Sequence, residues 1–435
     1  MMLVRIAYGR NEIDVPIPDS HPVDILEKHP VEAITDPVAR LRAGLEAPTD
    51  CAPLRELARG RRDAIIVVSD LTRPVPNATL LPPILAALRA GGLPLEAVTI
   101  LVATGLHRPN TAAELARMLG PELARSLRVE QHDARDAAAH RHLGRTTGGV
   151  PISLDRRFLD ADLKIITGLI EPHLMAGYSG GRKAVCPGLA AVETVRVAHG
   201  PAMLEGRIGP GIVDGNPLHD ALVEVLRKVG VDFLVNVAID RNRDIAGIFC
   251  GHPETAHAEG MAFVESESLV SLDAAADLVV TSGGGAPLDS TLYQSIKGIS
   301  TASSIVRPGG IILLCASLSE GVGSPSFEKL LRACADPSDF EARIDNPEFF
   351  AIDQWMIQHL CQARRRARVL LYTDAFPAAA VSEWLVEPVD SPAAGVEAAL
   401  ADLGPGARVA VLPQGPYVLA SVRGELRPLG GAPGG

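Results

Sequence analysis

Short apolar segments alternate along this chain with longer segments in which apolar residues recur at every third or fourth position. A short, continuous apolar run is typical of a strand buried on both faces, and the longer period is typical of an amphipathic helix. The predicted strands are Ala64–Ser69, Val98–Ala103, Leu163–Thr167, Phe233–Ile239, Leu278–Thr281, Ile311–Cys315, Val369–Tyr372 and Val409–Leu412. The predicted helices are Thr79–Ala90, Thr111–Met118, Val192–Ala198, Pro217–Val229 and Ser300–Val306. This alternation predicts an α/β fold with largely parallel sheets flanked by helices.

The chain is long enough to form two such sheets. It has 435 residues, of which 47% are hydrophobic, and this is more than one ordinary core accommodates. Residues 266–277 join a helical segment to a new strand without a Pro- or Ser-rich linker. We therefore predict a first domain over residues 1–270 and a second α/β domain over residues 271–435. The Gly- and Pro-rich tail, residues 427–435, is predicted to be disordered.

Charge and composition argue against several classes of function. The chain carries 52 acidic and 41 basic residues, and its longest basic run is Arg364–Arg366, so we do not expect it to bind nucleic acid. Its apolar runs are of strand length, and its N-terminal stretch lacks the features of a signal peptide. The six cysteines form no Cys-x-x-Cys pair, which fits reduced thiols. We expect a cytoplasmic protein without membrane contact, and composition leaves open whether it is a monomer or a homo-oligomer.

Polar residues of unusual type directly follow four of the predicted strands. In an open parallel sheet, ligands bind in the crevice beyond the carboxyl ends of the strands. Each of these loops alone is explained by a turn, since an Arg-Pro or Glu-Pro pair ends a helix. Together they favour a binding site. The loops are Asp70–Pro74, Thr104–Pro109, Gly168–His173 and Gly283–Gly285.

A glycine-rich stretch over residues 176–188 is the most informative part of the chain. Its glycines let the backbone approach a ligand closely, and Arg182 and Lys183 supply positive charge. It is not a Walker A loop, which needs Gly-Lys-Ser or Gly-Lys-Thr, and the chain has no dinucleotide-binding Gly-x-Gly-x-x-Gly motif. Two interpretations stay open: a surface turn with solvated cations, or a loop that holds an anionic cofactor and offers a lysine for covalent attachment.

Two further groups of residues are ambiguous by themselves. His199 ends the predicted helix Val192–Ala198, where a histidine is favoured electrostatically without any function. If His199 binds a metal, most other ligands must come from outside the protein, because no His or Cys lies nearby at ligand spacing. Tyr293, Gln294 and Lys297 begin a helix of the second domain, and they form either an exposed face or the opposite wall of a cleft.

In these motifs the chain resembles the nickel-dependent lactate racemase family, whose members carry a nickel-pincer nucleotide. In this cofactor, nickel is held by pyridinium-3-thioamide-5-thiocarboxylic acid mononucleotide. The likeness extends over nearly the whole chain, and its most specific part is the Gly-Tyr-Ser-Gly-Gly-Arg-Lys stretch with the later His-Gly. The matching motifs are Asp70–Pro74, Gly105–Pro109, Glu171–His173, Ala176–Pro187, His199–Gly200, Tyr293–Lys297 and Val411–Tyr417.

The resemblance implies a role for each matching residue. Lys183 would be bonded to the cofactor, and His199 would be the sole protein ligand of nickel. His107 and His173 would be the paired acid and base, and Arg73 would fix the substrate carboxylate. Four residues of one loop would contact the cofactor: Asp70, Leu71, Thr72 and Arg73. Gln294 and Lys297 would contact both the substrate and the cofactor, and Tyr293 would contact the substrate.

The family reaction agrees with the chemistry of these residue types. A hydrogen on the carbon beside a carboxylate is too weakly acidic for a side chain to remove easily as a proton. Its removal as hydride, while a histidine takes the hydroxyl proton, gives a stable 2-keto acid, and the cofactor carries the difficult step. The resemblance implies a racemase or epimerase of small, lactate-like 2-hydroxy acids. It also implies that the first domain binds the cofactor and that the active site lies in the cleft between the two domains. Cofactor-assembly proteins would be partners of the chain.

Two other functions stay open from the residues alone. His107 and His173 also suit a cofactor-free lyase or dehydratase that uses them as bases. The glycine-rich stretch also suits a nickel- or nucleotide-binding protein without turnover. The exact substrate is not determined, but we expect a short, mostly apolar side chain. Leu174 and Met175 follow His173, and Arg108 is the one nearby cation for a second carboxylate.

Overall fold

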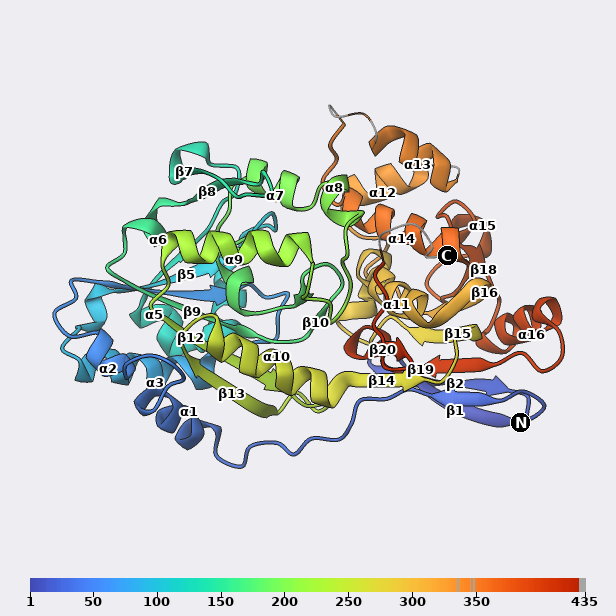
Figure 1. Ribbon diagram of the computed structural model, residues 1–435, viewed down its shortest axis with the longest axis horizontal. Coiled ribbons are helices and arrows are strands. Elements are labelled where there is room, and N and C mark those ends of the chain that lie inside the picture. Colours follow the sequence, from blue (N-terminus) through green and yellow to red (C-terminus); the bar gives the residue numbers. More distant parts are fainter. Residues whose placement is uncertain (335, 345, 347–348, 430–435) are drawn as a thin grey trace.

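The computed structural model describes residues 1–334, 336–344, 346 and 349–429, and two six-stranded sheets dominate it (Figure 1). The first sheet has the order β13-β12-β9-β4-β5-β6, and its strands are parallel except that β13 pairs antiparallel with β12. Its strands are β4 Ala64–Ser69, β5 Val98–Ala103, β6 Arg128–Gln131, β9 Leu163–Leu169, β12 Phe233–Ile239 and β13 Ile245–Gly251.

Helices cover both faces of the first sheet because its central strands are apolar throughout. In β4, Ile65 and Val67 join one buried cluster, and Ile66 and Val68 join another. The first cluster includes helix α9, and the second includes helices α1 and α3. The helices in this half are α1 Pro37–Glu46, α2 Leu54–Leu57, α3 Asn77–Ala90, α4 Ala112–Leu119, α5 Pro121–Ser126, α6 Arg156–Asp160, α7 Val192–Ala198, α8 Pro201–Leu204, α9 Pro217–Val229 and α10 Thr255–Ser268.

The second sheet has the order β18-β17-β16-β15-β19-β3, and all of its strand pairs are parallel. Its apolar residues again divide between two clusters, one with helices α11 and α14 and the other with helix α16. The strands are β3 Val23–Ile25, β15 Ala276–Ser282, β16 Val306–Cys315, β17 Ala367–Tyr372, β18 Glu387–Pro388 and β19 Val409–Leu412. The helices are α11 Leu292–Ile305, α12 Pro325–Arg332, α13 Pro337–Ile344, α14 Gln354–Arg366, α15 Ala378–Val381 and α16 Pro392–Leu403.

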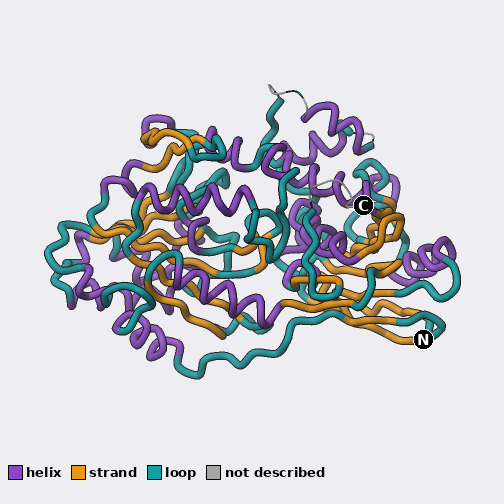
Figure 2. The backbone as a smooth tube through the Cα atoms, viewed as in Figure 1, coloured by secondary structure: helices purple, strands orange, loops and turns teal. Residues whose placement is uncertain are grey.

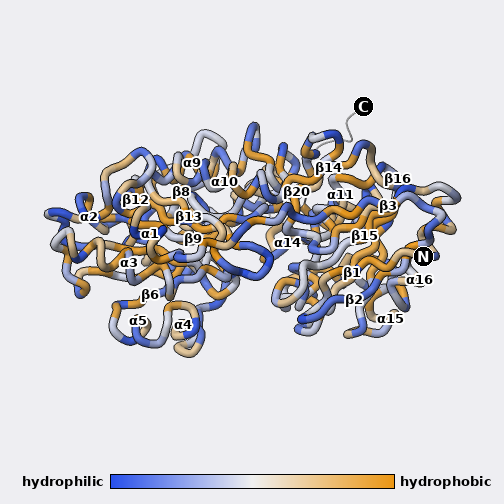
Figure 3. The backbone as a smooth tube through the Cα atoms, turned by 90° about the horizontal axis from the view of Figure 1, so that it is seen from below, coloured by the Kyte–Doolittle hydropathy of each residue, from blue (hydrophilic) through white to orange (hydrophobic). Residues whose placement is uncertain are grey.

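Short strand pairs complete the fold. The pairs are β1 Met2–Tyr8 with β2 Asn11–Ile17, β7 His140–Arg145 with β8 Pro151–Asp155, β10 Pro172–His173 with β11 Gly177–Tyr178, and β14 Leu269–Leu272 with β20 Leu419–Val422. Figure 2 shows the helices distributed around both sheets, and Figure 3 shows that the most hydrophobic segments run through the sheets. The first three strands lie with the second half of the molecule, because β3 pairs with β19 and the β1–β2 hairpin packs Val4, Ile6, Val15 and Ile17 against that sheet.

The predicted α/β fold class is confirmed, with two mainly parallel sheets flanked by helices. The strand pairing nevertheless puts residues 23–25 into the second sheet, although the sequence analysis assigned residues 1–270 to one domain. The division near residue 270 otherwise stays a prediction. The helix predicted over Ser300–Val306 is wrong in its bounds: apolar residues already face the core from Leu292, and Val306 begins β16.

Two further expectations concern the surface. None of the helices in the described ranges is both long and apolar enough to cross a membrane. In the predicted disordered tail, the backbone N–H of Leu429 donates to the carbonyl of Ile208, so the tail is held at this point. Residues 430–435 lie outside the described residues.

Candidate active site

A cleft of about 600 Å³ lies between the carboxyl ends of the first sheet and helices α11 and α14 of the second half. Its position follows from topology, because the loops after neighbouring parallel strands meet at one sheet edge. Every residue to which the resemblance assigns a role lines this cleft: Asp70, Leu71, Thr72, Arg73, His107, His173, Lys183, His199, Tyr293, Gln294 and Lys297. Their common location agrees with a single site, whereas their individual roles stay predictions. Arg182, expected to supply charge to a ligand, is instead buried and donates to the carbonyl of Ala176.

His107 is held by a buried carboxylate from the neighbouring strand loop. Because β4 and β5 are adjacent, Asp70 and His107 meet, and Asp70 Oδ2 lies 2.6 Å from His107 Nδ1. The other oxygen of Asp70 accepts the Thr72 hydroxyl at 2.6 Å. Burial raises the pKa of Asp70, but hydrogen bonds and charge, chiefly from His107, outweigh it and hold that pKa below its ordinary value. An ionised Asp70 therefore orients His107, a role beyond the predicted proximity to a cofactor.

His173 is fixed in a different way, by backbone groups. It ends the short strand β10, and its Nδ1 accepts the backbone N–H groups of Met175 and Ala176, each at 3.1 Å. Its pKa lies well below the ordinary value, because the ring is buried and the cations of Lys183 and Arg73 oppose a further positive charge. The ring of His173 is therefore neutral at physiological pH.

Lys183 reaches the cleft from the glycine-rich stretch. Residues Gly181–Ala184 form one short 3₁₀ turn, which begins after Gly180 at φ +73°. A side chain at Gly180 would bring a Cβ within 2.7 Å of Asn236 Oδ1, so only glycine fits there. Burial, with the charges of Arg73 and Arg182, lowers the pKa of the Lys183 amine to about 7. A large fraction of this amine is consequently neutral and nucleophilic near neutrality.

His199 presents one ring nitrogen that the protein leaves available. It follows the last residue of α7, and its Nδ1 donates to the carbonyl of Val195 at 3.1 Å. Burial lowers its pKa to about 3, so the imidazole is neutral and can use the lone pair on Nε2 for a metal. Within the described ranges, no group of three or more His, Cys, Asp and Glu side chains is arranged to hold a metal. A metal on His199 would therefore take its other ligands from a bound molecule.

The opposite wall comes from α11 and α14. Tyr293 OH accepts a hydrogen bond from Trp355 Nε1 at 3.0 Å, and the Trp355 ring lies 4.9 Å from the His199 ring. Burial and the charge of Arg73 lower the pKa of Lys297 to about 7. Among the described residues, none hydrogen-bonds to the side-chain oxygen of Gln294, which is closed off from solvent. An unpaired buried acceptor is costly, so the protein does not fully satisfy this side chain.

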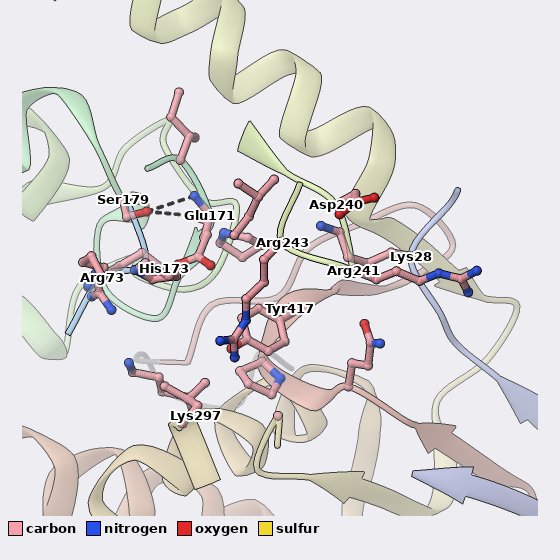
Figure 4. A pocket seen from close by; sticks show the side chains of 18 of the residues that line it. Lys28, Arg73, Glu171, His173, Ser179, Asp240, Arg241, Arg243, Lys297 and Tyr417 are labelled. Carbon is pink, nitrogen blue, oxygen red and sulfur yellow. Dashed lines mark hydrogen bonds between the residues drawn. The ribbon is translucent and has the colours of Figure 1, made fainter. Parts of the chain in front are cut away.

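A smaller chamber of about 170 Å³ adjoins the cleft and shares Arg73, His173 and Lys297 with it. Figure 4 shows Lys297 facing the side on which Arg73 and His173 lie, with Arg243 beside Tyr417. Arg243 donates to the carbonyl of Ala286 at 2.7 Å and so links the two halves of the molecule. The chamber extends the cleft on this side and adds Arg241 and Arg243, together with the carboxylates of Glu171 and Asp240.

Two features of the site, the contact of Trp355 and the ion pair of Arg108, were not evident from the sequence. Trp355 contacts His199 but belongs to no motif, and it is marked in the sequence only as one of two tryptophans. Arg108, the expected candidate for a second substrate carboxylate, forms two hydrogen bonds to Glu114, at 2.7 and 2.8 Å. Its charge is already compensated, and its side chain is 61% exposed.

Comparisons with known proteins agree with this site. Residues 8–209 match the lactate racemase N-terminal domain family, and residues 272–420 match the lactate racemase C-terminal domain family. A lactate racemase of Thermoanaerobacterium thermosaccharolyticum is 30% identical over 426 residues, which are 96% of this chain and 99% of that protein. A lactate racemase of Lactiplantibacillus plantarum is 32% identical over 375 residues, 85% of this chain and 88% of that protein.

Solved structures give the same result. The lactate racemase apoprotein from T. thermosaccharolyticum superposes with a TM-score of 0.91 at 30% identity, over 96% of this chain and 100% of that chain. A protein from Thermotoga maritima, 19% identical, superposes with a TM-score of 0.66 over 89% of this chain and 98% of that chain, and this shows likeness of fold alone. With both domain families matched in order and a relative aligned over nearly its full length, the chain belongs to the lactate racemase family, a family of isomerases.

Proposed function

We propose that the chain is a cytoplasmic racemase or epimerase of small, lactate-like 2-hydroxy acids that acts by reversible hydride transfer through a 2-keto acid. One observation carries the proposal: a single cleft contains two histidines, each held by a hydrogen bond to another part of the protein, and three basic side chains. Arg73, Lys183 and Lys297 form no ion pair with a carboxylate in the part of the chain that the structure describes. Unpaired cations in a partly buried cleft suit an anionic substrate and an anionic cofactor.

The residues fit the nickel-pincer nucleotide of the family. Lys183 offers an amine for covalent attachment, and it belongs to a turn that begins after Gly180, where a Cβ would clash with Asn236 Oδ1. His199 offers Nε2 to nickel, and Gln294 lines the same cleft. When bound, this cofactor supplies a centre that accepts a hydride from the substrate and returns it. The loop that would border the bound cofactor consists of Asp70, Leu71, Thr72 and Arg73, which all line the cleft.

The protein's own residues bind the substrate and manage its hydroxyl group. Arg73 and Lys297 come from opposite walls and hold the substrate carboxylate between them. Tyr293, oriented by Trp355, completes the wall beside the substrate. His107 and His173 act as acid and base: they accept the proton of the substrate hydroxyl group and return it. Fixed side chains of this kind position the reacting atoms without further reorganisation.

The substrate side chain is short and mostly apolar. Leu174, Met175, Ile352 and Met356 line the cleft, and Arg108 is neutralised by Glu114. We expect lactate and 2-hydroxybutyrate to be converted faster than malate in a panel of single-enantiomer acids. Faster conversion of malate would contradict this expectation and would indicate that Arg243 in the adjoining chamber binds a second carboxylate.

Metal analysis and a racemisation assay on the same preparations test the proposal. Protein made with the cofactor-assembly proteins should contain nickel and interconvert enantiomers, and protein made without them should do neither. Turnover without nickel to an unsaturated or cleaved acid would establish the lyase or dehydratase instead. Bound nickel or nucleotide without any conversion would establish a binding protein.

A further inference from the structure

Two lysine side chains line the cleft, one from each half of the molecule. Lys183 belongs to the glycine-rich turn of the first half, and Lys297 belongs to α11 of the second half. Neither forms an ion pair with a carboxylate of the described residues. The charge of Lys183 lowers the pKa of Lys297, so the two amines are close enough to repel each other when both are protonated. A positive charge on one amine therefore disfavours a positive charge on the other.

The surrounding charges favour the cationic form of Lys297 over that of Lys183. The carboxylate of Glu171, which lines the adjoining chamber with Lys297, stabilises a proton on that amine. The charged groups that act on Lys183 are Arg73 and Arg182, and both oppose its protonation. An ordinary lysine, with a pKa near 10.4, is neutral in fewer than about one molecule in 10³ at pH 7, whereas a pKa of about 7 leaves roughly half of the Lys183 amine neutral. Lys183 is therefore the nucleophilic amine of the two.

The cleft also contains groups that recognise a small keto acid. Arg73 lies near both lysines, since its charge opposes the protonation of each, and it forms no ion pair in the described part of the chain. Figure 4 shows Lys297 across from Arg73 and His173, where the cleft and the chamber meet. A carboxylate bound by Arg73 and Lys297 suits the fork of one and the charge of the other. A 2-keto acid held in this way brings its keto carbon into the space that the Lys183 amine borders.

We propose that Lys183, before a nucleotide is attached to it, forms a reversible imine with 2-keto acids. The amine nitrogen bonds to the keto carbon, the bonds from that carbon to its oxygen break, and both amine hydrogens leave with the oxygen as water. His107 and His173 line the same cleft and can relay these protons. The keto acid and the nucleotide compete for one nitrogen, so the imine delays attachment until water releases the keto acid. The inference rests on the proposed function only in its choice of ligand, because a 2-keto acid is the intermediate of that reaction.

Reductive trapping on the full chain, made without the assembly proteins, tests the proposal. Pyruvate is added at pH 7 with sodium cyanoborohydride, which reduces an imine to a stable secondary amine, and peptide mass spectrometry locates the modified residue. We expect one added pyruvate per chain, on Lys183, and its loss in Lys183→Ala. Lys164 and Lys228, which do not line the cleft, report the background reaction. An adduct on Lys297 instead, or labelling of Lys183 no faster than that of the background lysines, would overturn the proposal.

A pair of arginine variants distinguishes recognition of the keto acid from simple reactivity of the amine. Arg73→Gln should raise the pyruvate concentration for half-maximal labelling of Lys183 by about 10–100-fold, because a charged contact is lost. Arg108→Gln, which loses only an exposed ion pair, is the matched control and should label like the parent. Equal labelling of Arg73→Gln and the parent would overturn the proposal. If loaded protein converts no 2-hydroxy acid but Lys183 is still trapped, the proposed function fails and the imine stands; racemisation without trapping gives the reverse.

Discussion

The two walls of the cleft are prepared to different degrees. On the wall formed by the first sheet, hydrogen bonds within the protein fix the reactive side chains: Asp70 holds His107, the turn at Met175 holds His173, and Val195 holds His199. On the wall formed by α11, none of the residues that the structure describes hydrogen-bonds to the side-chain oxygen of Gln294. Lys297, on the same helix, likewise forms no ion pair within the described ranges.

This difference indicates a division of work between the walls. The three histidines of the first wall are held by protein groups whether or not a ligand is present, as suits binding of a cofactor and transfer of a proton. The second wall offers the amine of Lys297, which no carboxylate of the described residues neutralises, as suits recognition of an anionic substrate. Substitutions in the first wall should therefore affect loading or the chemical step, and substitutions in the second should affect substrate binding.

The largest effect is expected at Lys183. Lys183→Ala removes the amine in the glycine-rich turn, so attachment of the nucleotide should be lost completely. Intact-protein mass spectrometry of chain made with the assembly proteins should show the added mass on the parent and on Lys297→Met, but not on Lys183→Ala. An adduct that persists in Lys183→Ala, or that maps to Lys164 or Lys297, would show that the attachment site is wrong.

A smaller but still large effect is expected at Asp70. Asp70→Asn can hydrogen-bond to His107 but loses the charge that stabilises its protonated form, and an amide can impose the other tautomer. We expect kcat to fall by about 10²–10⁴-fold while the nucleotide adduct stays complete. Thr72→Val removes the hydroxyl that donates to Asp70 and serves as the milder control. Unchanged kcat in Asp70→Asn would show that the carboxylate does not act through His107.

Lys297 should produce the effect typical of the second wall. Lys297→Met should lower kcat/KM by about 10²–10³-fold without loss of the adduct. The pKa of Lys297 is lowered to about 7, so its cationic form predominates below pH 7 and is lost as pH rises through that value. The KM of the parent should therefore rise above pH 7, and Lys297→Met should lack this rise. A variant that loses the adduct together with activity would contradict the division between the walls.

The smallest effect is expected at Arg108. This residue lines the cleft, but its guanidinium is hydrogen-bonded to Glu114, which does not line the cleft. Arg108→Gln should change kcat/KM for lactate by less than about twofold, because an exposed ion pair with Glu114 contributes little. The preference between lactate and malate should also stay the same. A selective loss of malate conversion would show that Arg108 leaves Glu114 to bind a second carboxylate.

The sequence predicted some parts of this site better than others, for physical reasons. Strands such as Ala64–Ser69 are apolar throughout and are followed at once by polar loops, so both the strand and the position of Asp70 were predictable. Lys183 was predictable as a site residue because it lies in a glycine-rich stretch, residues 176–188. Trp355 was not predictable, because it reaches His199 from a helix 156 residues away in the sequence and shares no spacing with it. Residues 23–25 were counted in the first domain, because only tertiary packing shows that β3 lies beside β19.

The central claim is that the hydrogen at C2 leaves and returns as hydride. It is tested most directly with one enantiomer of the substrate, deuterated at C2, converted by cofactor-loaded enzyme in ordinary water. In the proposed mechanism His107 and His173 handle only the hydroxyl proton, so the product enantiomer should retain most of its deuterium. NMR or mass spectrometry of the product reads this out, and a primary isotope effect is expected where hydride transfer limits the rate. A base that removed C2–H as a proton would hold it on a histidine that exchanges with water. Rapid loss of deuterium to solvent during racemisation would contradict the account.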